Sequence, residues 1–82
     1  MKPITAGARV QFLRDNIGAF EHERLGRLTD EVYGIGDSGT SAFPHPRQNL
    51  ANEGWWYVEV ESKREPGKKL YVGVPAGWVV VL

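Results

Sequence analysis

The sequence contains no cysteine, so neither disulfide bonds nor thiolate metal sites can stabilise the fold. It has no apolar run near the roughly 18 residues of a membrane-spanning helix, and its opening, MKPITAGARVQ, lacks the apolar core of a signal peptide. Ten basic residues balance ten acidic ones, so no overall field favours nucleic acid or an anionic membrane. These absences predict a soluble, cytoplasmic protein without a membrane partner, stabilised by packing, backbone pairing or a partner subunit.

The residues that are present favour an all-β fold. Short runs rich in β-branched and aromatic residues alternate with Gly, Pro, Asn and Asp, which is typical of a domain of short strands. With 82 residues, the chain has room for one domain, which we expect to span residues 1–82 as a five-stranded small barrel. The predicted strands are Arg9–Arg14, Leu25–Tyr33, Trp55–Ser62, Lys69–Val74 and Trp78–Leu82.

Two of these strands indicate which side chains face the core. Side chains alternate across a strand, and the acidic residues of GWWYVEVES mark one face as solvent. The predicted inward set is Trp56, Val58, Val60, Leu70, Val72 and Val74, and the predicted outward set is Trp55, Tyr57, Glu59, Glu61, Tyr71 and Gly73. The sequence therefore places two large aromatics, Trp55 and Tyr57, on an outer face.

The turn between these two strands must agree with that face assignment. With a two-residue turn at Pro66-Gly67, the residue numbers of two cross-strand partners would add up to an odd number, and inward Val60 would lie opposite outward Gly73. The assignment requires even sums, such as Val60 with Val72. We therefore predict a three- or five-residue connection, or a bulge, around Glu65–Lys68.

The last third of the chain resembles a Src-homology-3 domain. The Trp-Trp pair at the start of a strand, the hairpin that follows, and the segment GVPAGWV at Gly73–Val79 occur in the order of that family. The first half departs from the family pattern, because GARVQFLRD followed by LGRLTDEV is more similar to the opening of bacterial and ribosome-associated barrels of the same fold. The resemblance implies a five-stranded Src-homology-3-like barrel with a long ordered loop between strands 2 and 3.

The resemblance also implies a non-enzymatic protein-interaction module. Its ligand platform would comprise Trp55, Pro75 and Trp78 beside the outer Tyr57, and the loop Asp15–Arg24 would supply an acidic flank of Asp15, Glu21 and Glu23. Such a surface suits a proline-rich segment that carries a basic residue, since a preformed polyproline helix docks on aromatic ridges at low entropic cost. The alternative is that Trp55 packs under the long loop and Trp78 covers the end of the barrel.

The segment Gly34–Gly54 contains two patterns that resemble functional motifs. GIGDSG matches a dinucleotide fingerprint, but TSAFPHP cannot continue as the helix that this fingerprint requires. GDSG resembles the nucleophile segment of chymotrypsin-like proteases, whose site lies between two barrels. We therefore interpret the glycines as turn formers and predict no contact of Ser38 with a histidine. The segment is predicted to be an ordered lid or recognition loop anchored by Phe43 and Leu50, with at most a turn at Pro46–Ala51.

Other functions are weighed on a few residues each. Adjacent ligands in Glu21-His22-Glu23 would diverge, and Leu70–Gly73 lacks the active segment of the type II dihydrofolate reductases, which the layout also resembles. We accordingly predict no catalytic, cofactor-binding or metal-binding residue. Nucleic-acid binding stays open as the alternative through the basic hairpin residues Lys63, Arg64, Lys68 and Lys69, as does a subunit of a homo-oligomeric assembly. Free-standing barrels of this length are of the kind that bacteria and phages encode as accessory proteins.

Overall fold

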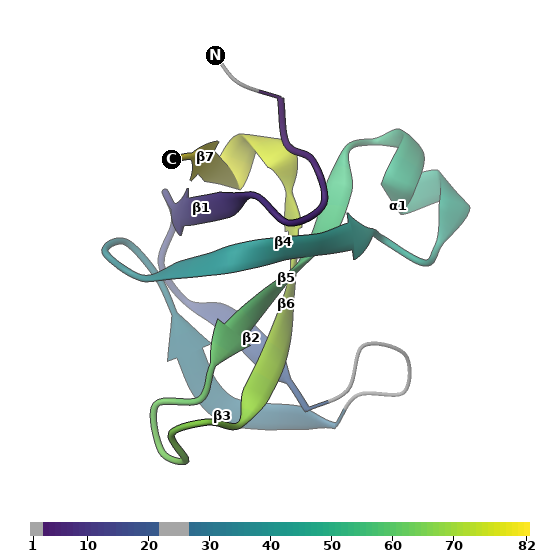
Figure 1. The fold of residues 1–82 in the computed structure, drawn as a ribbon. Helices are drawn as coiled ribbons and strands as arrows, with labels where there is room; N and C mark the ends of the chain where they lie inside the picture. Colours follow the sequence, from purple (N-terminus) through teal and green to yellow (C-terminus); the bar gives the residue numbers. More distant parts are fainter. Residues whose placement is uncertain (1–2, 22–26) are drawn as a thin grey trace.

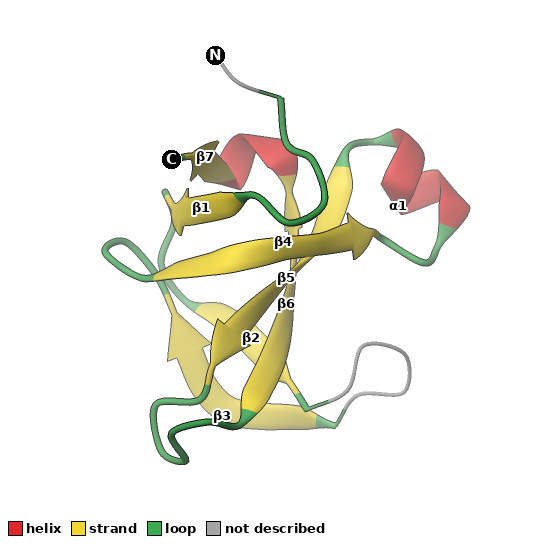
Figure 2. Cartoon of the chain, viewed as in Figure 1, coloured by secondary structure: helices red, strands yellow, loops and turns green. Residues whose placement is uncertain are grey.

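The computed structural model describes residues 3–21 and 27–82, which form one antiparallel sheet of seven strands (Figures 1 and 2). The elements are β1 (Arg9–Phe12), β2 (Ile17–Phe20), β3 (Leu28–Tyr33), β4 (Ser38–Pro44), α1 (Gln48–Asn52), β5 (Trp55–Glu61), β6 (Lys69–Pro75), a 3-10 helix (Ala76–Trp78) and β7 (Val79–Val81). The strand order is β3-β2-β6-β5-β4-β1-β7. No helix in the described part of the chain is long and apolar enough to cross a bilayer.

The all-β prediction is confirmed, but five strands and a long loop are not what the described residues form. β2 lies inside the predicted acidic loop Asp15–Arg24, and β4 and α1 lie inside the segment Gly34–Gly54, which is therefore not one loop. The start of the predicted strand Leu25–Tyr33 falls outside the described residues, and β3 begins at Leu28. The turn predicted at Pro46–Ala51 is a one-turn helix that ends before Gly54, whose positive φ of 87° lets the chain turn into β5.

The core confirms the predicted inward face of the β5–β6 hairpin. Eleven buried apolar residues form one cluster: Val10, Phe12, Ile17, Ala19, Tyr33, Val58, Val60, Leu70, Val72, Val74 and Val79. Trp56 pairs with buried Val74 and points to the same side, but it is only half-buried. The inner face of this hairpin could thus be read from alternation alone.

The β5–β6 connection also confirms the parity argument. The two strands pair without a bulge from Trp55 opposite Pro75 to Glu61 opposite Lys69, so every pair has an even sum. The Ser62 N–H donates to the Lys68 carbonyl at 2.8 Å, which leaves a five-residue connection over residues 63–67. The inward partners are Val58 with Val72 and Val60 with Leu70. The register therefore differs by two residues from the predicted example, in which Val60 lay opposite Val72.

Candidate functional site: an aromatic row on the outer face

Five half-buried rings follow one another across the outer face of β4, β5 and the 3-10 helix. We call them the aromatic row, and in spatial order they are Trp78, Trp55, His45, Tyr57 and Phe43. Ring centroids are 6.2 Å apart for Trp78 and Trp55, 6.4 Å for Trp55 and His45, 4.9 Å for His45 and Tyr57, and 5.5 Å for Tyr57 and Phe43. Pro75 lies beside the row, because it is the cross-strand partner of Trp55.

Backbone hydrogen bonds hold the strand ends that carry these rings. The His45 N–H donates to the Trp55 carbonyl at 3.0 Å, and the Ala76 N–H donates to the Gly54 carbonyl at 2.8 Å. The Leu13 N–H donates to the Trp78 carbonyl at 2.8 Å, which ties the 3-10 helix to β1. The row is therefore mounted on paired backbone, a rigid support for a recognition surface.

A β-bulge turns Phe43 and His45 toward the outer face. Ser41 is buried opposite Val58, and the register then shifts by one residue, so that Phe43 lies opposite outward Tyr57. Because side chains alternate with a period of two, unbroken pairing would have put Phe43 and His45 on the same inner face as Ser41. The extra residue, Ala42, thus completes the aromatic row.

Gly73 leaves a gap in the outer face of β6 beneath two of the rings. It pairs with Tyr57, and a Cβ atom added to Gly73 would lie 3.4 Å from Tyr57 Cε1 and 3.8 Å from His45 Cδ2. A methyl group would therefore fit in ordinary contact, whereas a larger side chain would have to displace these rings. The position offers a way to alter the row without touching the core.

His45 is held as a neutral imidazole within the row. Burial against the neighbouring rings, and next the charge of Arg47, lower the pKa of His45 from its ordinary value of 6.5. Its Nδ1 accepts a hydrogen bond from the Arg47 N–H at 3.0 Å, which a proton on Nδ1 would break. Neutrality suits a ring packed edge-on against Tyr57 and Trp55.

His45 should make the fold less stable in mild acid. Because the folded state lowers this pKa, the unfolded chain binds the proton more readily, so stability is full above pH 6.5 and falls as the pH drops through the folded pKa. We expect the thermal midpoint to drop more between pH 7.5 and about 5 in the wild type than in His45→Gln. Melting curves of both proteins measure the difference, and equal slopes would contradict the assignment.

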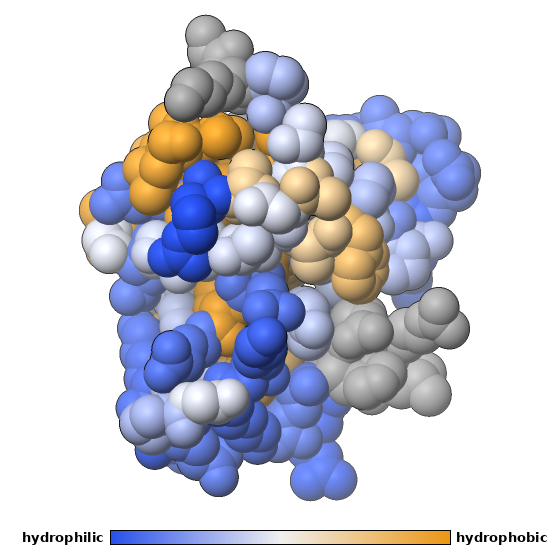
Figure 3. Space-filling view, viewed as in Figure 1, coloured by the Kyte–Doolittle hydropathy of each residue, from blue (hydrophilic) through white to orange (hydrophobic). Residues whose placement is uncertain are grey.

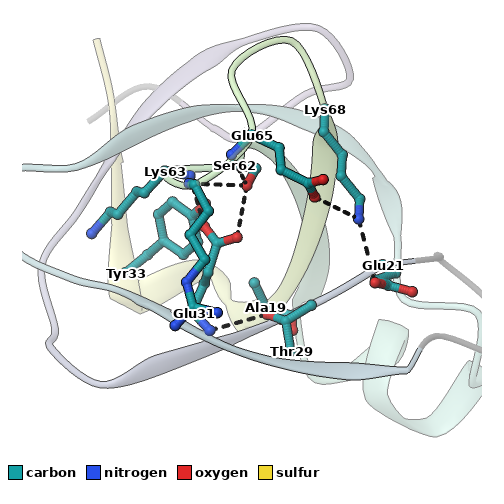
Figure 4. Close-up of polar contacts among 10 residues, drawn as sticks. Ala19, Glu21, Thr29, Glu31, Tyr33, Ser62, Lys63, Glu65 and Lys68 are labelled. Atoms are coloured by element: carbon teal, nitrogen blue, oxygen red, sulfur yellow. Dashed lines mark hydrogen bonds and ion pairs between the residues drawn. The ribbon is translucent and has the colours of Figure 1, made fainter.

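Asp15 and Glu21, the two described residues of the predicted acidic flank, make their contacts away from the Trp55–Pro75 end of the aromatic row. Asp15 Oδ1 accepts a hydrogen bond from the Ile35 N–H at 3.0 Å, and Glu21 forms an ion pair with Lys68 at 3.3 Å (Figure 4). Lys68 lies at the turn end of the β5–β6 hairpin, about 20 Å along the strands from the Trp55–Pro75 pair. The flank was misplaced because part of the supposed loop is β2, which pairs with β3 and β6. Glu23 lies outside the described residues.

A carboxylate network closes the turn end of the hairpin instead (Figure 4). Glu31 of β3 accepts hydrogen bonds from Ser62 Oγ and from the Lys63 N–H, both at 2.7 Å, and from the Tyr33 hydroxyl at 3.2 Å. The Ser62 hydrogen bond is the main cause that lowers the pKa of Glu31, while burial raises the pKa of Tyr33 to about 12. The network joins β3 to the β5–β6 turn, so we interpret it as structural.

Glu31 should contribute to acid stability. Its lowered pKa means that its contribution is complete above the ordinary value of 4.5 and is lost as the pH falls through the folded pKa. Glu31→Gln is expected to melt at a lower temperature than the wild type at pH 7, with a difference that shrinks by pH 3. Glu53→Gln, at an exposed carboxylate, is the control and should follow the wild type. If the difference in melting temperature between Glu31→Gln and the wild type stayed constant from pH 7 to pH 3, protonation of Glu31 would not contribute to acid unfolding.

The GIGDSG segment is explained by backbone geometry. Gly36 has a positive φ of 97°, which confirms its predicted role in a turn. At Gly34 and Gly39 the cause is close approach instead: an added Cβ would lie 3.0 Å from the Asp15 Cα and 2.6 Å from the Glu59 carbonyl oxygen, respectively. Ser38 Oγ accepts a hydrogen bond from Arg9 Nη2 at 2.9 Å.

The two histidines weighed for catalysis lie elsewhere or outside the described residues. His45 belongs to the aromatic row, and His22, with the rest of Glu21-His22-Glu23 beyond Glu21, is not described. Within residues 3–21 and 27–82, no group of three His, Cys, Asp or Glu side chains is arranged to hold a metal ion.

The basic hairpin residues weighed for nucleic-acid binding each have an acidic partner. The ion pairs are Lys63 with Asp37 at 3.1 Å, Arg64 with Asp30 at 2.6 Å, Lys68 with Glu21 at 3.3 Å and Glu65 at 3.0 Å, and Lys69 with Glu59 at 3.4 Å. Exposed pairs of this kind add little stability, but they offset the positive charge that a phosphate backbone would meet. The hairpin is therefore a mixed-charge surface.

Sequence reasoning found part of the aromatic row and missed the rest. It placed Trp55, Tyr57, Pro75 and Trp78 on the outer surface, and the structure brings these four residues together. Phe43 was expected as an anchor of a loop, and His45 was not among the predicted residues of the ligand platform. The available signal was the spacing of two residues between Phe43 and His45, which places both side chains on one face of a strand. The bulge decides that this face is the outer one. No family model, curated protein or solved structure compared with the chain matches it.

Proposed function

We propose that this chain is a non-enzymatic protein-interaction module that docks an extended segment of a partner protein on the aromatic row. The observation that carries the proposal is the meeting of Trp55, Pro75 and Trp78, which come from three elements and form one surface of half-buried side chains. Trp78 also packs against the core cluster from the end of the sheet. An aromatic surface of this kind on a small domain is an interaction site more often than an accident. The other rings of the row extend the same surface across β4 and β5.

The element order supports a Src-homology-3-like arrangement as the framework, in a sheet whose described strands end at β3 and β7. A tryptophan pair opens β5, a 3-10 helix joins β6 to β7, and β7 pairs back onto β1. In this assignment the five barrel strands are β1, β4, β5, β6 and β7. The β2–β3 hairpin is then an insertion after the first strand, and α1 lies in the connection between β4 and β5.

The ring geometry favours a peptide over stacked bases. Neighbouring ring planes are tilted by 34° and 47°, or nearly perpendicular at 87° and 89°. Edge-to-face packing covers the faces on which successive bases would stack, and leaves a ridged surface into which proline or aliphatic side chains fit. Asp15 and Glu21 make contacts elsewhere, so the proposal rests on the aromatic row and not on an acidic flank.

A peptide-display selection on the immobilised chain tests the proposal. Peptides selected by the wild type are measured for binding to Gly73→Val and to Gly18→Val, two exchanges of a strand glycine without positive φ for a β-branched residue. Valine at Gly73 adds two methyl groups beside Tyr57 and His45, whereas at Gly18 it meets the flexible end of the exposed Leu28 side chain. We expect Gly73→Val to weaken binding about tenfold or more and Gly18→Val to leave it unchanged.

Salt and an alternative ligand complete the test. Binding of the selected peptides should change little between about 50 and 200 mM salt, a range that weakens phosphate-driven binding steeply. Selected peptides that bind Gly73→Val as tightly as the wild type would contradict the proposed site. A single-stranded oligonucleotide bound in preference to any peptide, with a steep salt dependence, would replace the proposal with nucleic-acid binding.

A further inference from the structure

The β7 strand is one end of the sheet, and one of its two backbone edges has no partner among the described strands. Among the described strands it pairs only with β1, through Val79, Val80 and Val81. Its neighbours Trp78 and Leu82 each hydrogen-bond to β1, since the Leu13 N–H donates to the Trp78 carbonyl and the Leu82 N–H donates to the Arg9 carbonyl. Backbone groups alternate in direction along an antiparallel strand. Those of Val80 therefore also face β1, and the N–H and C=O groups of Val79 and Val81 face the open edge.

The opposite edge of the sheet shows the contrast. β3, with the sequence LTDEVY, carries Asp30 and Glu31 along its length, and charged side chains are a common means by which edge strands avoid pairing. β7 reads VVV and carries neither a charge nor a proline. An edge of this composition is suited to receiving another strand.

Apolar surface surrounds the open edge of β7. A groove of about 220 Å³ lies there, lined by Ile4, Leu13 and the three valines of β7 among others. Leu13 and Val80 are 48% and 38% exposed, and Figure 3 shows hydrophobic surface gathered over the end of the molecule where β1 and β7 lie. The groove is smaller than the roughly 300–1,000 Å³ of small-molecule sites, so it suits aliphatic side chains of an added strand.

We propose that β7 pairs in antiparallel fashion with β7 of a second copy of this chain, about a two-fold axis at Val80. In this register Val79 lies opposite Val81 of the second copy, and the two exchange both backbone hydrogen bonds on each side of the axis. Each strand presents to the other the same uncharged edge, so no charge is buried. The formal net charge of zero means that the two copies do not repel each other at long range.

A single-cysteine variant tests the register. Val80 would face its own counterpart in a non-hydrogen-bonded pair, with Cα atoms about 4.5 Å apart, which is within disulfide range. Because the chain has no other cysteine, Val80→Cys should form a covalent dimer under mild oxidation. Ile35→Cys, 68% exposed in the β3–β4 connection, is the control and should remain largely monomeric. Equal cross-linking of both variants, or none at Val80→Cys, would overturn the register.

Sedimentation equilibrium of the full chain tests the association itself. The average mass should rise with concentration toward that of two chains, and Val80→Lys should raise the dissociation constant about tenfold or more, because two ammonium groups then oppose each other. Ile35→Lys is the control and should dimerise as the wild type does. A wild-type chain that stays monomeric at all concentrations overturns the proposal and leaves the edge to an extended segment of a different protein. Peptide binding by the aromatic row does not enter either measurement, so the two proposals fail separately.

Discussion

Replacing Gly39 by alanine is expected to lower the free energy of unfolding by about 3 kcal/mol, the upper range for overpacking a close-packed interior. Gly39 is buried in β4 where the strand crosses β5, and an added Cβ would lie 2.6 Å from the Glu59 carbonyl oxygen and 2.8 Å from Val58 Cγ1. The backbone oxygen cannot move without separating β4 from β5. In a domain of this size such a loss is a large part of the total stability. Urea unfolding at neutral pH measures it.

The neighbouring Ser38 supplies the control. Ser38→Ala removes one exposed hydrogen bond with Arg9 and should change the unfolding free energy by less than about 0.5 kcal/mol. Close packing therefore makes Gly39, and not the exposed Ser38 beside it, the position at which a small substitution destabilises the fold. If Gly39→Ala unfolds at the same urea concentration as the wild type, the contact between β4 and β5 is looser than the structure describes.

The parts of the fold that the sequence predicted are those in which hydrophobicity alternates strongly. Val58, Val60, Leu70 and Val72 alternate with polar or aromatic residues, so both the inner face and the even pairing of β5 with β6 followed from the period of two. Of the rings of the candidate site, Trp55 and Tyr57 followed from the same alternation.

β4 could not be predicted in this way because its inward positions are small. Gly39 and Ser41 face the interior, where β5 approaches too closely for a larger side chain at Gly39. A strand whose buried residues are glycine and serine resembles a loop in any hydrophobicity pattern. The bulge after Ser41 then reverses the side on which Phe43 and His45 lie, and nothing local in the sequence marks a bulge.

β2 was missed for a related reason. Ile17 and Ala19 are its only buried residues, and charged residues precede and follow the strand in the sequence. Its pairing with β3 and β6 is a tertiary effect that overrides weak local preference. Because β2 carries the chain from Asp15 to Glu21, the acidic flank that was expected beside the aromatic row is distributed along another side of the sheet.

The two adjacent tryptophans should separate binding from folding. Trp55 belongs to the aromatic row, whereas Trp56 lies on the other face of β5 and pairs with buried Val74. Trp55→Ala is expected to reduce affinity for peptides selected on the wild type by about 2 kcal/mol or more, roughly thirtyfold, as for a central aromatic anchor. Trp56→Ala is expected to lower the unfolding free energy by about 2 kcal/mol, because the side chain is only half-buried, and to leave affinity per folded molecule unchanged.

Both variants are measured by urea unfolding and by titration calorimetry corrected for the folded fraction. Trp55→Phe adds a further comparison, since it keeps a ring between His45 and Trp78 and should recover part of the affinity lost in Trp55→Ala. The expected pattern depends on the two indoles lying on opposite faces of β5, which backbone alternation requires. If Trp55→Ala weakens only the fold and its remaining folded molecules bind the selected peptides normally, Trp55 covers the end of the sheet, and the binding surface must lie on a part of the molecule that does not include Trp55.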